Sequence, residues 1–195
     1  DVKLPNVQPL IEMADIRADV VLAATVKSAS YHETFEAGMP EAWKTQGNVD
    51  VAQGGAFKGE KALRLARAED ALQTPTDAAG VAFAAGPGTW LASGACKTDL
   101  KSPDNSYQGS VALEALNDQG AVLERLPVRT QSGKGTWQSF KKQVKLPAGT
   151  AKARFVVSLK KASGSFLVDE LAAAHVVAAE GAESRVERIL LSSER

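Results

Sequence analysis

The stretch TAKARFVVSLKKASGSFLVDEL, residues 150–171, gives the clearest indication of the fold. Apolar side chains occupy every second position of its first half, at Ala153, Phe155, Val157 and Leu159. The intervening positions hold the more polar set Arg154, Val156, Ser158 and Lys160. Alternation with a period of two is typical of a strand that is buried on one face. The small residues ASGS then mark a turn, and the apolar run FLV begins a second strand.

Asp169 and Glu170 follow that apolar run directly, so a carboxylate lies inside a strand that is otherwise buried. Burying an unpaired charge costs several kcal/mol even after the protein relaxes, and Asp169 therefore needs a partner. A salt bridge or hydrogen bonds from backbone N–H groups would serve. Glu170 is expected on the opposite face of the strand, in solvent.

Further strands are predicted along the middle of the chain, with turn residues between them. Residues 61–67 (KALRLAR) alternate, and residues 109–128 (GSVALEALNDQGAVLERLPV) predict a hairpin with its turn at 117–120. Additional strands are expected at 79–84, 88–97 and 136–146. Many strands about ten residues apart or slightly more, with no helical pattern between them, predict an all-β protein and specifically a β-sandwich.

The charge balance argues against nucleic acid as a partner. The 195 residues include 23 Lys and Arg against 23 Asp and Glu, so the chain is formally neutral. Lysines occur in two separate pairs, at 141–142 and 160–161, near predicted strand ends, and they form no cationic stripe. Binding to nucleic acid needs a patch that neutralises phosphates, and none is indicated.

Other composition features leave the compartment open. Cys96 is the only cysteine, so an internal disulfide is excluded, which suits a cytosolic protein and also a bacterial exported one. The longest apolar run, at 19–26, is too short to span a bilayer. The sequence begins at Asp1 without a leader, which suggests a processed protein or a piece of a longer one.

The two ends differ from the strand-rich middle. The segment QPLIEMADIRADVVLAATV near the start fits a helix or a strand, and the polar tail rich in Ala, Glu and Arg fits either as well. We expect residues 31–178 to form the sandwich domain. Residues 1–30 are then an N-terminal extension or linker, and residues 179–195 are a C-terminal extension or the start of a following domain.

No motif indicates an enzyme. His32 and His175 are far apart in the sequence, and neither lies in a metal or nucleophile motif. Cys96 is interpreted as a small core residue of an alternating strand. The glycine-containing segments are turns that lack the context of a phosphate-binding loop. The paired carboxylates of a glycoside hydrolase would be close only in space, and nothing in the sequence indicates them.

Aromatic residues, which make up 6% of the chain, are the candidates for a sugar-binding surface. Exposed rings stack on sugars, and a few polar side chains then bond the hydroxyl groups. Trp43 and Trp137 are interpreted as core side chains. Trp90 and Tyr107 are the candidates for exposed rings, Trp90 because small residues follow it and Tyr107 because it lies in a polar loop.

Several segments, taken in order, resemble the jelly-roll carbohydrate-binding modules of the family 4, 9 and 22 type, which have a galactose-binding-like fold. The resemblance covers about residues 31–178. The segments are ETFEAGMPEAW (33–43), FKGEKALRL (57–65), GTWLASGACKTD (88–99), GTWQSFKKQVKLPAGTAKARFVVSL (135–159) and GSFLVDELAAA (164–174). The resemblance implies a β-sandwich jelly roll for this domain.

The same resemblance implies a partner for Asp169. In such modules a structural calcium ion often joins the first strand to the last. Its ligands here would be the carboxylates of Glu36 and Asp169 and the backbone carbonyls of Gly59 and Lys61. Calcium accepts six to eight oxygen ligands, including carbonyls, so this donor set suits Ca²⁺. A salt bridge or backbone N–H groups remain the alternative.

The function implied by the resemblance is non-catalytic, calcium-stabilised binding of a polysaccharide or oligosaccharide. Trp90 and Tyr107 would stack on the sugar, and Gln108 or Asn105 would bond its hydroxyls. The module would belong, with other domains, to a larger exported protein that is extracellular, on the cell surface or in the bacterial periplasm.

Two alternatives stay open. The first is a structural or protein-interaction jelly roll, without a sugar site, in a cell-surface or multidomain assembly, since one fold serves many functions. The second is a free-standing hydrolase, which would need a cleft that holds two nearby carboxylates with separated pKa values.

Overall fold

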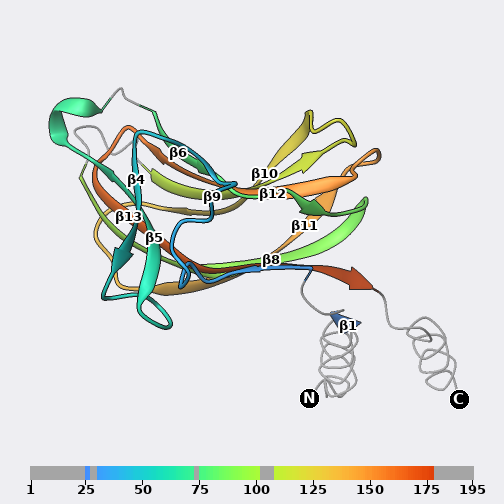
Figure 1. Cartoon of the computed structure of the whole chain (residues 1–195), viewed down its shortest axis with the longest axis horizontal. Helices are drawn as coiled ribbons and strands as arrows, with labels where there is room; N and C mark the ends of the chain where they lie inside the picture. Colours follow the sequence, from blue (N-terminus) through green and yellow to red (C-terminus); the bar gives the residue numbers. More distant parts are fainter. Residues whose placement is uncertain (1–24, 27–29, 73–74, 102–107, 178–195) are drawn as a thin grey trace, which may run out of the picture. The chain divides into compact units, whose positions relative to one another are not determined.

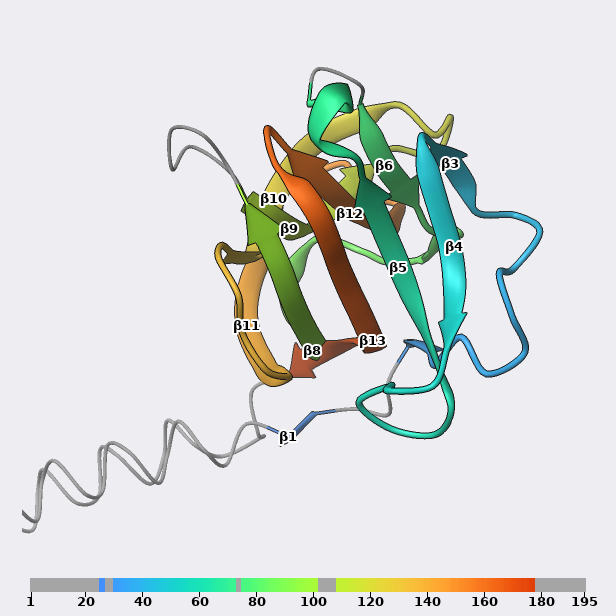
Figure 2. The ribbon, with the colours of Figure 1, turned by 90° about the vertical axis from the view of Figure 1, so that its left-hand side faces the viewer.

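Two antiparallel β-sheets lie face to face, as the alternating pattern predicts (Figures 1 and 2). The computed structural model describes residues 25–26, 30–72, 75–101 and 108–177. The first sheet has the order β11-β8-β13-β5-β4, with β1 and β2 also paired to β13. The second has the order β10-β9-β12-β6-β3, with β7 also paired to β12.

The strands and a single 3₁₀ turn account for most of the described chain. They are β1 (Thr25–Val26), β2 (Tyr31–Glu33), β3 (Lys44–Gln46), β4 (Asn48–Gln53), β5 (Lys61–Arg67), η1 (Glu69–Ala71), β6 (Thr76–Ala79), β7 (Phe83–Ala84), β8 (Gly88–Lys101), β9 (Gln108–Leu116), β10 (Val122–Gln131), β11 (Gln138–Leu146), β12 (Lys152–Lys160) and β13 (Ser163–Val177). Within these residues, no helix is long and apolar enough to cross a membrane.

The core lies between the two sheets and is built from every second residue of the central strands. In the second sheet, Phe155 and Val157 of β12 pair with Leu113 and Val111 of β9, and all four are fully buried. The first sheet contributes a matching apolar set, of which Phe166 is the largest member on β13. Each fully buried side chain of this kind contributes about 1.5–3 kcal/mol relative to an exposed one.

Several strand predictions are confirmed in place and type. The predicted strand at 61–67 is β5, and the predicted hairpin at 109–128 is formed by β9 and β10. Its turn closes with a hydrogen bond from the N–H of Asn117 to the carbonyl oxygen of Ala121. The all-β sandwich is therefore confirmed.

Other strand boundaries differ from the prediction. The strand predicted at 79–84 is two short strands, β6 and β7, interrupted at Gly80, which packs against the Trp43 ring so closely that a Cβ would lie 3.0 Å from it. The strand predicted at 88–97 continues to Lys101. The strands β3 and β4 were not predicted. The three residues of β3 (KTQ) are polar and exposed, and β4 (NVDVAQ) is mostly half-buried, so neither contributes a fully buried side chain to the core.

The chain divides into two compact units. One comprises residues Ser28–His175 and contains the sandwich. The other comprises Asp1–Lys27 and Val176–Arg195, of which the structure describes β1 and the last two residues of β13, paired as Thr25 with Val177 and Val26 with Val176. The proposed helix or strand near residues 5–28 and the tail at 179–195 otherwise lie outside the described residues, and the predicted domain boundaries stay predictions.

Candidate functional site

Asp169 faces away from the second sheet because it directly follows the core residue Val168, and β13 carries a β-bulge immediately after it. Val168 before the bulge and Leu171 after it are both fully buried in the core, although they are three positions apart. The register against β8 shifts between Asp169 and Ala172, and Glu170 has a φ of 52°. The additional residue keeps both apolar runs on the inner face, because it brings Leu171 into the core where regular alternation would have placed Glu170.

Backbone N–H groups are the partners of the Asp169 carboxylate. Its Oδ2 accepts hydrogen bonds from the N–H groups of Phe57 at 3.1 Å and Lys58 at 3.0 Å, and its Oδ1 accepts one from Glu170 at 2.8 Å. Asp169 is fully buried, and no lysine or arginine in the described part of the chain forms a salt bridge with it. Burial raises the pKa of Asp169, and the three N–H groups act against that rise.

Glu36 binds the other end of the segment whose N–H groups contact Asp169. Its Oε1 accepts hydrogen bonds from the N–H groups of Glu60 and Lys61, both at 2.9 Å, and its carbonyl oxygen accepts one from Nζ of Lys61 at 2.9 Å. Gly59 has a φ of 72° and leaves no room for a Cβ beside the Glu36 carboxylate. Residues 54–60, which we call the held loop, are thus fixed by two carboxylates through four loop and strand N–H groups.

The four residues predicted to bind calcium do come together around the held loop. Oxygen donors of this kind suit Ca²⁺, but the N–H of Glu60 points to Glu36, and the carbonyl of Gly59 in the same trans peptide therefore points away from it. An ion bound as predicted would require this peptide group to turn. Within the described residues, no three His, Cys, Asp or Glu side chains are grouped for a metal, so calcium stays a prediction.

The held loop presents an aromatic pair. The rings of Phe57 and Trp137 lie 5.9 Å apart between centroids and are tilted by 54°. The indole N–H of Trp137 donates a 2.8 Å hydrogen bond to the carbonyl oxygen of Gly55, which ties it to the loop. Phe57 is 46% exposed and Trp137 is half-buried. The interpretation of Trp137 as a core side chain is wrong, because it lies just before β11, where the held loop covers only part of its ring.

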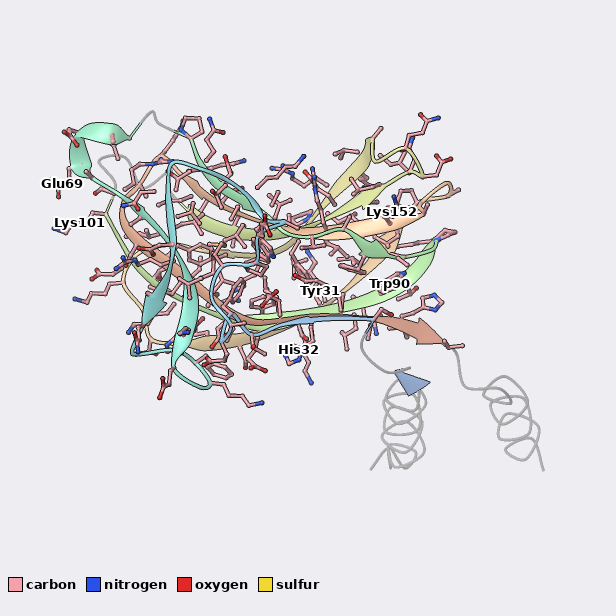
Figure 3. All side chains as sticks on the ribbon, in the orientation of Figure 1. Tyr31, His32, Glu69, Trp90, Lys101 and Lys152 are labelled. Carbon is pink, nitrogen blue, oxygen red and sulfur yellow. The ribbon has the colours of Figure 1, made fainter. Side chains whose placement is uncertain are left out.

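Trp90 does not offer an exposed ring, which corrects the prediction that it stacks on a sugar. It is 3% exposed and lies between the two sheets (Figure 3). Its indole N–H donates to the carbonyl oxygen of Gly86 at 3.0 Å, and its ring packs against Phe83 and His175. A ring enclosed by neighbouring side chains cannot stack on a polysaccharide.

Gln108 is far from Trp90, so the two do not form one site. Gln108 is half-buried at the start of β9 and pairs with Lys160. Ser163, shortly after Lys160, pairs with Lys101 at the end of β8, whereas Trp90 lies near the beginning of that strand. At about 3.3 Å per strand residue, the two ends of β8 are more than 30 Å apart. Asn105 and Tyr107 lie outside the described residues.

The remaining candidates for chemistry are separated. Cys96 is fully buried, as predicted, and its thiol donates to Oε1 of Gln131 at 2.8 Å. Burial raises the pKa of Cys96, which disfavours the nucleophilic thiolate. His32 contacts Glu170 with a 3.1 Å distance between Nε2 and Oε2 on an exposed surface. These groups offer no nucleophile with an adjacent base, whereas the Phe57–Trp137 pair offers a surface for stacking.

Comparison with known proteins finds the fold but no relative in sequence. No protein-family model matches the chain, and no curated protein matches it in sequence. The CBM22-1 xylan-binding domain of Paenibacillus barcinonensis Xyn10C is similar in structure, with a TM-score of 0.57 and 18% identity over 80% of this chain and 100% of that domain.

Two longer proteins contain a similar structure. The CBM22-1-GH10 modules of Clostridium thermocellum endo-1,4-β-D-xylanase 10B, solved with xylohexaose, match with a TM-score of 0.53 and 13% identity over 75% of this chain and 28% of that one. The enzymatically active domain of tailspike protein 4 from bacteriophage CBA120 matches with a TM-score of 0.58 and 10% identity over 74% of this chain and 20% of that one. This chain therefore spans only a fifth to somewhat more than a quarter of these two proteins.

Identities of 10–18% show a shared fold and leave the ligand open. The fold itself is the one that the order of sequence segments predicts. The chain has the jelly-roll fold of the carbohydrate-binding modules.

Proposed function

We propose that residues 31–178 form a non-catalytic module that binds a polysaccharide reversibly, with the Phe57–Trp137 pair as its stacking surface. The observation that carries the proposal is this pair, a partly exposed phenylalanine and an indole held together on the outer face of a sandwich. The similar xylan-binding domain supports a glycan as the ligand class.

The rigidity of the held loop favours binding. Stacking of a sugar on a ring gives modest affinity, so a surface that must first become ordered would lose much of it. The N–H groups of Phe57 and Lys58 are bonded to Asp169, and those of Glu60 and Lys61 to Glu36, on either side of Gly59. The ring of Phe57 is therefore placed before any ligand arrives.

Calcium and export belong to the proposal as well. A structural Ca²⁺ would be held by Glu36, Asp169 and the carbonyls of Gly59 and Lys61 once the Gly59–Glu60 peptide group turns. It would neutralise two carboxylates that the described residues pair mainly with N–H groups. The xylanase with CBM22-1 and GH10 modules supports a place within a larger multidomain protein. Export belongs to the proposal through the family resemblance alone. Tyr107, Asn105 and Gln108 stay predicted contacts.

The test is affinity electrophoresis in gels that contain xylan, galactan, β-glucan or cellulose derivatives, with calcium present. The wild type is compared with Phe57→Ala, Trp137→Ala and Tyr107→Ala, and with Val81→Ala as a control that removes an apolar side chain exposed to 36%. We expect retention on one glycan class, a loss of at least about tenfold in affinity, about 1.4 kcal/mol, for Phe57→Ala and for Trp137→Ala, and no loss for Val81→Ala. A loss for Tyr107→Ala as well would identify that residue as a further contact.

An interaction domain without a sugar site is the second candidate, and the burial of Trp90 favours it. The Phe57–Trp137 pair would then contact another protein. The absence of retention on every glycan would support this reading. Retention that is equal in all variants would place the sugar site elsewhere on the module.

A further inference from the structure

The outer face of the second sheet carries a row of three charged residues in register on neighbouring strands. Glu114 of β9, the middle strand of the three, pairs with Arg125 of β10 on one side and with Arg154 of β12 on the other. Arg125 approaches Oε1 through Nε at 2.8 Å and Nη2 at 2.6 Å. Arg154 approaches Oε2 through Nε at 2.8 Å and Nη2 at 2.7 Å. One carboxylate thus orients two guanidinium groups.

Each guanidinium keeps a free edge. The contacts with Glu114 use the Nε–Nη2 side, and the opposite edge of Arg125 and of Arg154, formed by Nη1 and Nη2, has no further acceptor among the described residues. The side chain of Glu114 is 3% exposed, whereas those of Arg125 and Arg154 are 49% and 25% exposed. The carboxylate is therefore buried beneath two donors that remain accessible to solvent. Three N–H groups of each guanidinium are left for a ligand.

The surrounding face is cationic although the whole chain is neutral. The outward positions are those that alternate with the core residues of each strand. Cations at these positions are Lys44, Arg125, Lys152, Arg154 and Lys160, and the acids are Glu114 and Asp77. The outward positions of this sheet therefore carry five positive charges and two negative ones. Figure 3 shows Lys152 on β12 at the far end of the sheet from η1.

We propose that this row binds the carboxylate groups of an acidic polysaccharide, with uronate residues as the recognised units. A guanidinium edge and a carboxylate are both planar, and two parallel N–H···O bonds join them in a bidentate pair. Glu114 holds both guanidinium groups in place, so the ordering cost of two long side chains is met before binding. The inference rests on the proposed function for its ligand class, but it uses a different face of the module.

The experiment is affinity electrophoresis on polygalacturonate and on its methyl ester, which removes the charge and keeps the backbone. Dextran sulfate forms a third arm. The variants are Arg125→Gln, Arg154→Gln and Arg125→Lys, with Lys145→Gln as a matched loss of one exposed charge on β11 of the other sheet. The thermal unfolding of each variant is measured first.

We expect the wild type to bind polygalacturonate, to ignore its methyl ester, and to lose at least tenfold in affinity through either glutamine substitution. Arg125→Lys keeps the charge but removes the planar guanidinium edge with its two parallel N–H donors, so it should lose part of the affinity. Lys145→Gln should lose little. Equal losses in all variants, binding to the ester, or retention on dextran sulfate alone would overturn the proposal. If Arg154→Gln fails to fold, the comparison of Arg125→Gln with Arg125→Lys tests the proposal.

The two proposals fail separately. Retention on a neutral glycan that depends on Phe57, without retention on polygalacturonate, overturns this inference and keeps the proposed function. Retention on polygalacturonate that depends on Arg125, without Phe57-dependent retention on any neutral glycan, keeps this inference and overturns the aromatic site.

Discussion

Gly59 is the single residue on which the shape of the held loop depends most directly. Its φ of 72° lies in the left-handed region, and a Cβ would overlap the carboxylate of Glu36. Gly55 in the same loop has a φ of 76° but open space around the position of a Cβ. The two glycines therefore share the backbone requirement and differ only in the contact.

Alanine at these two positions separates backbone strain from crowding. Gly55→Ala should lower the free energy of unfolding by about 1–2 kcal/mol, the cost of a left-handed residue with a Cβ. Gly59→Ala should lose at least about 1 kcal/mol more, because Glu36 must move and release two N–H groups. Urea denaturation of both variants measures the difference. Equal losses would mean that Glu36 does not hold the loop.

Residue positions within one strand explain which aromatic predictions succeed. Trp43 is 6% exposed and Cys96 is fully buried, as the sequence predicts. Trp90 and Cys96 are six positions apart in β8, so their side chains share a face. A core position for Cys96 thus implies a core position for Trp90, and the prediction of an exposed Trp90 overlooked this parity.

At the scale of elements, the held loop and the bulge of β13 act together. The loop covers a buried carboxylate that has no cationic partner among the described residues, and the proposed Ca²⁺ would supply one. Chelation with excess EDTA should then destabilise the protein by about 2–3 kcal/mol, the linkage expected for a site that is saturated about a hundredfold. That corresponds to a fall in Tm of roughly 5–10 °C for a domain of this size.

Asp169→Asn should abolish the response to EDTA, since it removes a charged ligand. Asp118→Asn, at an exposed turn, should leave the response unchanged. Differential scanning calorimetry with and without EDTA measures both. A wild-type Tm that EDTA does not change, together with no calcium by metal analysis, would show that N–H groups alone satisfy Asp169.

The sequence predicts which segments form the site but not how these segments contact one another. Glu36, Gly59, Lys61 and Asp169 are grouped as the family resemblance implies, because the same segments recur in order. The contact of Trp137 with the held loop joins residues 82 positions apart. It depends on how the start of β11 is positioned beside β8 and on the path of a loop, and alternation specifies neither. Phe57 has no local feature that separates it from a core phenylalanine.

At the scale of the whole molecule, the two outer faces of the sandwich carry different chemistry. The first sheet bears the held loop with its aromatic pair, and the second bears the row of Arg125, Glu114 and Arg154. A neutral net charge conceals this division. Because both surfaces lie on one rigid core, a glycan that carries neutral and acidic units could engage either face without a change in the fold.

The buried core of the sandwich should fold without the terminal segments. Every member of the buried cluster lies between Phe35 and Ala173, so a chain cut to residues 28–178 keeps all of it. The shortened chain should melt within a few degrees of the full chain and keep its glycan affinity. Cutting to residues 36–178 removes β2 and Phe35, which is fully buried, and should cost at least about 3–5 kcal/mol, the loss typical of a core phenylalanine. Thermal unfolding of the two fragments is the measurement. A 28–178 fragment as unstable as the 36–178 fragment would mean that segments outside the sandwich are required for its stability.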